Sequence, residues 1–283
     1  MCSDRALLLL FACAAACSSE APPPEALHAD YQAAPPAPLA CVPNLDGRID
    51  ASELPIALGV PESFVVSPQG TTRSVDVAGA ESDGGQRVWD WSVDYGDDEL
   101  ATLSASALAG KWYASSFPQG QFVLPFDPAD ENEAVYSADS TAVWLWGIAS
   151  SQPNPTSGET LLPYTNPVPV YEFPLQKGSD WSATGEVQNG TLQGLPYAGI
   201  DSYQFAVEDQ GILELPDLTF TQAMALHITL TTTPAVGAPL TTREVSFVFE
   251  CFGEVARATS LPNETNDDFT TAAELRRLSL ERR

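Results

Sequence analysis

The amino-acid sequence predicts a mainly β fold, either an antiparallel sandwich or a curved open sheet that forms a half-barrel. Short runs of alternating apolar and polar residues recur from residue 63 onward, and turns that contain Gly, Pro or Asn separate them. Helical spacing is scarce and is clearest in a short N-terminal turn and at the C-terminus. Many short strands between such turns are typical of an antiparallel sheet that folds back on itself.

Several stretches carry clear strand signals. Residues 89–95 alternate between large apolar and polar side chains, whereas residues 142–148 are apolar throughout and predict a strand covered on both sides. Asn189-Gly190 lies between two short runs and predicts a two-residue hairpin turn. Residues 100–108 fit a helix or a strand. Alternation places three groups on single faces: Tyr203, Phe205 and Val207; Met224, Leu226, Ile228 and Leu230; Val245, Phe247, Phe249 and Cys251.

Two short helical segments are predicted. Asp50 and Glu53 have the spacing of a capping box at the start of the first. Thr271 and Glu274 repeat that spacing near the C-terminus, and arginines follow at the end where a helix dipole favours cations. The sequence therefore predicts a helix within the C-terminal tail.

The N-terminus has the layout of a cleaved export signal. An apolar run follows Arg5 and ends in small residues directly before Cys17. The run is shorter than the roughly 20 residues that a spanning helix needs. It resembles the signal of bacterial lipoproteins, in which such a cysteine receives a diacylglycerol and becomes the new N-terminus. The resemblance implies lipidation at Cys17, and Ser18 implies sorting to the outer membrane. Cys13 as the acceptor and an ordinary secretory signal are the alternatives.

The chain divides into five predicted segments. The segment after the signal has six prolines between residues 18 and 40 and no apolar periodicity, so it would act as a semi-extended tether. The segments are a signal peptide (1–16), the Pro-rich tether (17–40), a loop with a short helix (41–62), an antiparallel β domain of one or two modules (63–262) and a tail with a short helix (263–283).

Two cysteines remain once the signal and Cys17 are set aside. They are Cys41, at the start of the predicted folded part, and Cys251, near its end. Exported proteins fold where thiols are oxidised, so the two residues predict one disulfide. The alternative is a pair of unrelated buried thiols.

The charge balance limits the partners. The chain has 38 acidic and 12 basic residues, for a net charge of −26. Such a surface repels phosphate backbones and anionic lipid headgroups. We therefore expect no nucleic-acid partner, attachment to the membrane through the lipid alone, and an unidentified protein or glycan partner.

The segment 44–53 resembles a degenerate EF-hand calcium loop. Its positions 3, 5, 7, 9 and 12 are occupied by Asn44, Asp46, Arg48 (through its backbone carbonyl), Asp50 and Glu53. Position 1 is Val42 where the loop needs an aspartate, so any bound calcium should be weak. The favoured alternative is that Asp50 and Glu53 cap a short helix. No other cofactor is expected.

Catalytic motifs are scarce. The chain has two histidines and lacks the common nucleophile, metalloprotease and phosphate-loop motifs. Clustered carboxylates could serve a carboxylate-dependent hydrolase: Asp90, Asp94, Asp97, Asp98 and Glu99. Six tryptophans could form a sugar-binding platform, although large β domains more often bury them: Trp89, Trp91, Trp112, Trp144, Trp146 and Trp181.

The later part of the chain resembles uncharacterised envelope proteins of bacteria. The resemblance covers residues 173–257 and includes a Gly-x-x-Trp strand at 178–181, a Leu-Pro-x-x-Thr-Phe turn at 215–220 and a Gly-x-Val strand end at 253–255. It implies a curved antiparallel sheet and carries over no catalytic residue. The sequence thus predicts a lipid-anchored envelope protein with a non-catalytic binding or interaction role. A hydrolase or a carbohydrate-binding module at the cell surface is the alternative.

Overall fold

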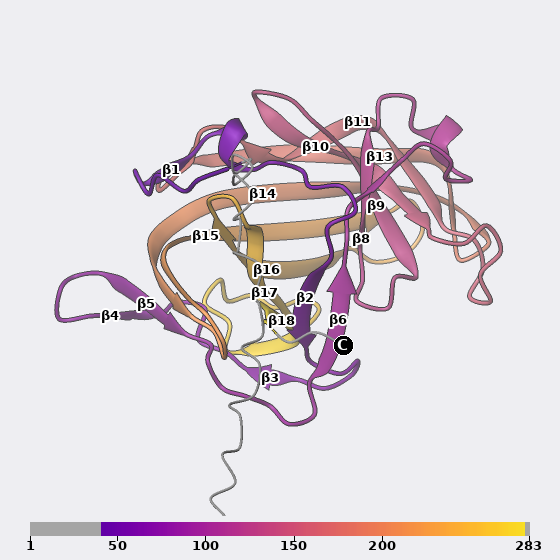
Figure 1. The fold of residues 1–283 in the computed structure, drawn as a ribbon. Helices are drawn as coiled ribbons and strands as arrows, with labels where there is room; N and C mark the ends of the chain where they lie inside the picture. The colour runs from indigo at the N-terminus through magenta and orange to yellow at the C-terminus, as the bar shows by residue number, and fades with distance from the viewer. Residues whose placement is uncertain (1–40, 281–283) are drawn as a thin grey trace, which may run out of the picture. The chain divides into compact units, whose positions relative to one another are not determined.

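Alternation of apolar and polar side chains produces an almost entirely β fold (Figure 1). The computed structural model describes residues 41–280, so the predicted signal peptide and the whole predicted tether, including Cys17, lie outside the described residues. Within residues 41–280, no helix is long and apolar enough to cross a membrane.

The described elements follow one another along the chain in this order: β1 (Arg48–Ile49), the 3-10 helix η1 (Ala51–Glu53), β2 (Glu62–Val66), β3 (Arg73–Ser74), β4 (Ala80–Glu81), β5 (Arg87–Asp90), β6 (Glu99–Leu103), β7 (Ser106–Ala107), the 3-10 helix η2 (Ala114–Ser116), β8 (Phe122–Pro125), β9 (Asn132–Ala138), β10 (Ala142–Ser150), β11 (Leu161–Glu172), β12 (Leu175–Gln176), β13 (Asp180–Leu192), β14 (Leu195–Glu214), β15 (Thr219–Pro234), β16 (Leu240–Phe249), β17 (Gly253–Ser260) and β18 (Thr271–Leu278).

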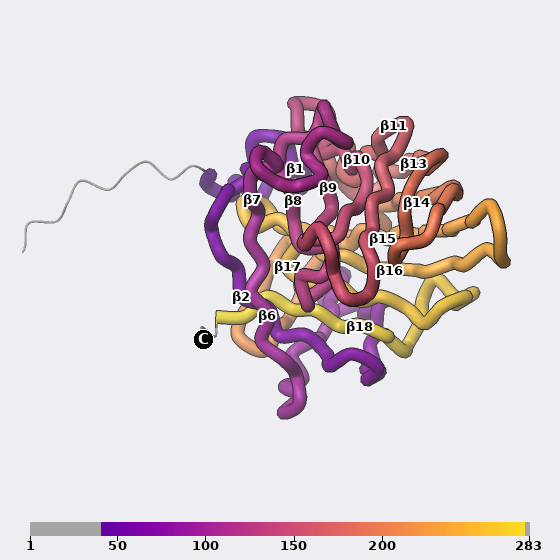
Figure 2. The backbone as a smooth tube through the Cα atoms, turned by 90° about the vertical axis from the view of Figure 1, so that its right-hand side faces the viewer, coloured from indigo at the N-terminus to yellow at the C-terminus, as the bar shows by residue number. Residues whose placement is uncertain are grey.

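Sixteen strands form one curved sheet, and β1 pairs with β12 in a second, two-stranded sheet. The main path runs β6-β2-β18-β17-β16-β15-β14-β13-β11-β10-β9-β8-β7. Its two end strands, β6 and β7, are separated by only two residues in the chain and lie on the same side of the molecule (Figure 2). No ladder between these two strands is formed in the described part of the chain, so the sheet bends strongly but stays open. The prediction of a mainly β, antiparallel fold is confirmed.

The long central strands are apolar on both faces. Met224 and Leu226 of β15 lie in one core with Phe205, and we call this the inner face. Ala223 and Ala225 alternate with them and lie in a second core, on the outer face. Both faces are buried because β8–β11 cover the inner face and the segment 75–91 covers the outer one. Alternation thus correctly grouped the apolar residues of β14, β15 and β16.

The predicted C-terminal helix is wrong. Thr271–Leu278 forms strand β18, which pairs with β17 on one side and with β2 and β3 on the other. Capping-box spacing is a local signal, whereas the sheet satisfies the backbone of this segment from both sides and buries Leu275 at 2% exposure. Tertiary pairing therefore overrides the local helical spacing.

The predicted hairpin turn at Asn189-Gly190 is also wrong. Both residues lie inside β13, at a shift in its register with β14. The turn falls instead at Gln193-Gly194, whose φ angles of 49° and 77° are those of a tight hairpin turn. Gly190 serves close packing, since a Cβ there would lie 2.5 Å from Cγ1 of Val187.

Two neighbouring arginines occupy opposite faces of β18. Arg277 is 1% exposed on the outer face and donates to the carbonyl oxygen of Trp91 at 2.8 Å, to that of Val93, and to Oδ2 of Asp98 at 2.6 Å. Arg276 is 4% exposed on the inner face and donates to Oε1 of Glu254 at 2.7 Å. A buried charge is tolerated only when it is paired and hydrogen-bonded, so both arginines depend on these partners.

Replacing Arg277 with Met should be strongly destabilising. The substitution removes one of the cations that pair with the buried Asp98 carboxylate. Breaking such a buried pair lowers the free energy of unfolding by about 3–5 kcal/mol. Urea denaturation measures the change. Lys177→Met removes a cation whose side chain is 59% exposed, and it should leave the stability nearly unchanged. Equal losses in the two variants would contradict the structural role of Arg277.

Candidate functional site

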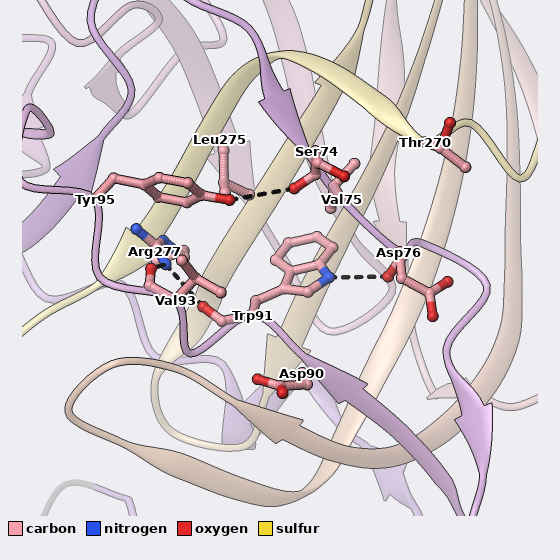
Figure 3. A pocket seen from close by; sticks show the side chains of 10 residues that line it. All are labelled: Ser74, Val75, Asp76, Asp90, Trp91, Val93, Tyr95, Thr270, Leu275 and Arg277. Carbon is pink, nitrogen blue, oxygen red and sulfur yellow. Dashed lines mark hydrogen bonds between the residues drawn. The ribbon is translucent and has the colours of Figure 1, made fainter.

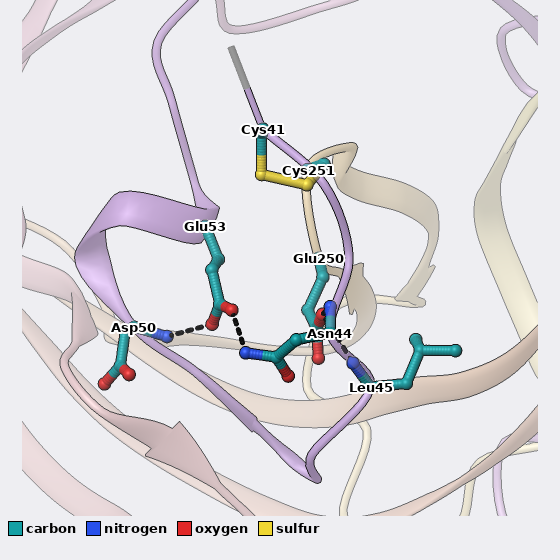
Figure 4. The surroundings of a disulfide bond; sticks show 7 residues. All are labelled: Cys41, Asn44, Leu45, Asp50, Glu53, Glu250 and Cys251. Atoms are coloured by element: carbon teal, nitrogen blue, oxygen red, sulfur yellow. Dashed lines mark hydrogen bonds between the residues drawn. A yellow bond between two sulfur atoms is a disulfide. The ribbon is translucent and has the colours of Figure 1, made fainter. Parts of the chain in front are cut away.

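The two residual cysteines meet beside the predicted calcium loop (Figure 4). Cys41 and Cys251 form a disulfide with their Cα atoms 5.5 Å apart, within the normal range for such a bridge. The pairing follows the sequence prediction, but the parity argument for Cys251 does not hold. Cys251 lies in the turn after β16 with a φ angle of 68°, so strand alternation no longer applies to it.

Two buried glutamates reinforce this junction. Oε2 of Glu250 accepts the backbone N–H groups of Asn44 at 2.7 Å and Leu45 at 3.0 Å. The Glu53 carboxylate accepts the side-chain amide of Asn44 and the backbone N–H of Asp50. The backbone N–H of Cys251 donates to the carbonyl oxygen of Glu53 at 2.7 Å. We call the contacts among residues 41–53 and 250–251 the latch, because they fasten the first described segment to the β16–β17 turn.

The latch uses the groups that the calcium interpretation needs. Both oxygens of Glu53 accept hydrogen bonds inside the latch, and Asp50 pairs with Arg48. Oδ1 of Asp46 accepts the backbone N–H of Arg48 at 3.1 Å. Across residues 41–280, no three His, Cys, Asp or Glu side chains form a group that could hold a metal ion. The 3-10 turn η1 after Asp50 fits the capping interpretation.

Of the acidic cluster at residues 90–99, Asp90 lines a hollow of 420 Å³ on the outer face, and Asp98 binds Arg277, which also lines it (Figure 3). Asp98 lies between two arginines. Arg73 donates to its Oδ1 at 2.7 Å, and Arg277 donates to its Oδ2. The ring of Tyr95 lies under the guanidinium of Arg73, 4.3 Å from its centroid. Trp91 and Tyr95 line the hollow. Arg73 pairs with the carboxylate of Asp98 and covers one face of the Tyr95 ring.

Three members of this cluster are engaged in ion pairs or hydrogen bonds. Asp97 and Asp98 pair with Arg73. Hydrogen bonds from the hydroxyl and the backbone N–H of Ser92 hold the pKa of Asp90 below its usual value. A general acid needs a raised pKa to keep its proton near neutral pH, and Asp90 shows the opposite shift. The two remaining members of the predicted set, Asp94 and Glu99, are exposed.

A second charged cluster on the inner face was missed in the sequence. Glu254 accepts from Arg257, from Arg276 at 2.7 Å and from the hydroxyl of Ser246 at 2.9 Å. Burial opposes ionisation of Glu254, but the two arginines outweigh it and hold the pKa of the carboxyl below its usual range. Alternation along 253–260 places Arg257 and Ala256 on different faces of the strand. It cannot identify the partners of Arg257 on other strands. The contacts describe a structural ion-pair network.

The tryptophans separate into distinct environments. Trp89 and Trp91 are buried on the outer face, edge-on to Phe247 at 4.9 and 4.8 Å between ring centroids. Trp181 is half-buried on the inner face, where it stacks on Phe205 at 4.9 Å.

Trp112 covers the segment around η2 and donates its N–H to the carbonyl oxygen of Ser150 at 2.9 Å. Trp144 and Trp146 are half-buried and line a surface depression of 370 Å³. These last two residues are therefore the half-buried tryptophans that line an open depression.

Comparison of the sequence and structure with known proteins finds no significant match. No protein-family model matches the sequence, and neither a curated protein nor a solved structure is significantly similar to it. Inference about function therefore rests on the chain itself.

Calcium at about 5 mM should leave the melting temperature unchanged, because the latch already uses the candidate ligands. Glu53→Ala should lower the free energy of unfolding by about 1–3 kcal/mol, since it removes the charged acceptor of hydrogen bonds from Asn44 and Asp50. The exposed Asp46 in the same loop gives a matched control, and Asp46→Ala should cost less. A calcium-induced rise in melting temperature that Glu53→Gln abolishes would restore the calcium interpretation.

Removing the disulfide should destabilise the protein without changing its fold. The double variant Cys41→Ser/Cys251→Ser should lose about 2–5 kcal/mol in urea denaturation, because the bridge restricts the unfolded chain. Peptide mapping of non-reduced wild-type protein should recover the two cysteines in one linked fragment. Free thiols at both positions in protein taken from the cell envelope would contradict the bridge.

Proposed function

We propose that this chain is a lipid-anchored protein of the bacterial cell envelope with a non-catalytic binding role. The anchor is a diacylglycerol on Cys17, and the chain is sorted to the outer membrane, on its periplasmic face or at the cell surface. The observation that carries the proposal is the Cys41–Cys251 disulfide, which begins directly after the Pro-rich tether. Structural disulfides are typical of exported proteins and rare in the cytosol.

The surroundings of the titratable groups support a non-catalytic role. Arg73 and Arg277 neutralise the carboxylates at 97–98, and the latch holds Glu53 and Glu250 with N–H donors. His227 is half-buried in β15, and burial lowers its pKa. It lies 3.7 Å from Glu208, and no hydroxyl or thiol nucleophile is hydrogen-bonded to its ring among residues 41–280. These groups are engaged in contacts that stabilise the fold, which supports a non-catalytic role.

The charge of the chain directs the choice of partner. A net charge of −26 opposes contact with nucleic acids and with anionic headgroups. The lipid therefore supplies the attachment to the membrane, and the β domain supplies the contact with an unidentified protein or glycan.

Substitution of Cys17 tests the anchor. Metabolic labelling with an alkyne fatty acid should tag the wild-type protein, and Cys17→Ala should abolish the tag and release the protein from the membrane fraction. Cys13→Ala serves as the matched control and should keep both. A tag that persists in Cys17→Ala but disappears in Cys13→Ala would move the anchor to Cys13. Wild-type protein that is unlabelled and soluble would overturn the proposal.

A further inference from the structure

Two tryptophans stand side by side on the outer face of β10. Trp144 and Trp146 alternate with Leu145, which is 4% exposed in the inner core. The segment around η2 covers much of this face, and the depression opens beside it. Its lining combines aromatic, polar and imino-acid side chains: Gln119, Ser137, Asp139, Trp144, Trp146 and Pro167.

A bulge in β10 determines where Trp146 points. The register shifts between Leu145 and Gly147 in the ladders with both neighbouring strands, β9 and β11, so Trp146 is unpaired in each. Gly147 has a φ angle of 138°, and a Cβ there would lie 2.1 Å from the carbonyl oxygen of Leu162. The bulge therefore requires glycine at this position. Bulges of this kind commonly redirect a side chain next to a functional site.

Hydrogen bonds fix both indole rings at the depression. Nε1 of Trp144 donates to Oδ2 of Asp139 at 2.9 Å, and Nε1 of Trp146 donates to the hydroxyl of Ser137 at 2.8 Å. The Thr141 hydroxyl and backbone N–H groups lower the pKa of Asp139 to about 2, so this carboxylate stays ionised. Ring orientations are thus set before any ligand arrives, which reduces the entropy lost on binding.

Polar groups remain available beside the rings. The exposed side chain of Gln119 forms no hydrogen bond with another of the described residues, so both its donor and its acceptor can serve a ligand. Oδ2 of Asp139 accepts one hydrogen bond, from Trp144, and has a second acceptor site. Aromatic faces next to an amide and a carboxylate match a ligand that is apolar on its ring faces and rich in hydroxyl groups around its edge.

We propose that the depression formed by Trp144, Trp146, Gln119 and Asp139 binds an uncharged oligosaccharide. The C–H groups on a sugar face meet the negative face of an indole ring, while Gln119 and Asp139 bind its hydroxyls. The volume of 370 Å³ lies within the range of about 300–1,000 Å³ found for small-molecule sites. The net charge of −26 disfavours anionic glycans. This inference rests on the binding role proposed above and gives that role a ligand class.

The larger hollow on the outer face is less suited to a sugar. The guanidinium groups of Arg73 and Arg277 lie 4.3 and 5.4 Å from the ring centroid of Tyr95. Trp91 is 3% exposed. Neither ring offers a free face there, whereas Trp144 and Trp146 are half-buried at an open depression.

Calorimetric titration of the folded protein with cellotetraose, maltotetraose and chitotetraose, each to about 10 mM, tests the site. We expect at least one of the three to bind with a Kd of about 10⁻⁴–10⁻³ M. Trp144→Ala should weaken that binding about tenfold or more, because it removes a stacking face. Trp181→Phe changes a tryptophan on the inner face and should leave the affinity unchanged.

A second variant guards against misfolding. Trp146 also packs in a small core with Phe117 and Val135, so Trp146→Ala can lose binding through instability. Gln119→Ala removes an exposed side chain with no internal hydrogen bond, and it should weaken binding while circular dichroism and melting temperature stay unchanged.

Three outcomes are decisive. Failure of all three oligosaccharides to bind would overturn the sugar site but leave the lipid anchor and the non-catalytic role as proposed. Binding that survives both Trp144→Ala and Gln119→Ala would place the ligand elsewhere and would also overturn the site. Release of new reducing ends, together with binding that needs Trp144, would support the site and contradict the non-catalytic role.

Discussion

The burial of two adjacent arginines in β18 is the constraint on which the rest of the structure depends. Successive side chains in a strand point to opposite faces, so Arg276 and Arg277 each need a partner on a different side of the sheet. Glu254 of β17 serves the first, and Asp98 serves the second. An unpaired buried charge costs several kcal/mol, so β18 is stable in the sheet only when β17 and the segment that leads to Asp98 are both in place. The Arg277–Asp98 pair connects segments that lie 179 residues apart in the sequence.

The same constraint limits what the acidic residues can do. The chain has a large excess of carboxylates, yet its buried or largely buried ones are held by partners. Arginines hold Asp98 and Glu254, N–H donors hold Glu53 and Glu250, and Lys111 and the hydroxyl of Tyr113 hold Glu133. Groups held in this way are fixed in position by their partners, which suits structural support better than proton transfer. The binding role that we propose would therefore fall to surfaces where aromatic and polar side chains remain accessible, and the depression at Trp144 has both kinds.

Alternation predicted the features that depend on one strand at a time. It identified the long strands of the sheet and the shared face of Met224 and Leu226, and counting cysteines identified the disulfide. It was wrong for most of residues 89–95, because β5 ends at Asp90 and the chain from residue 91 to 95 forms no strand. It failed where a distant segment decides the outcome. Thr271 and Glu274 carry a helical spacing that strand pairing overrides, and Gly190 marks close packing instead of a turn. The bulge that orients Trp146 was equally invisible, because a register shift is a property of neighbouring strands.

The central claim is that residues 271–278 form a strand whose two arginines are buried on opposite faces. Backbone carbon-13 chemical shifts of this segment, measured by NMR on the folded protein, test it most directly. The structure predicts Cα shifts below and Cβ shifts above their random-coil values from Thr271 to Leu278, together with slow hydrogen exchange at the amides that pair with β17. Cα shifts above random coil through the same residues would mean a C-terminal helix and would contradict the account.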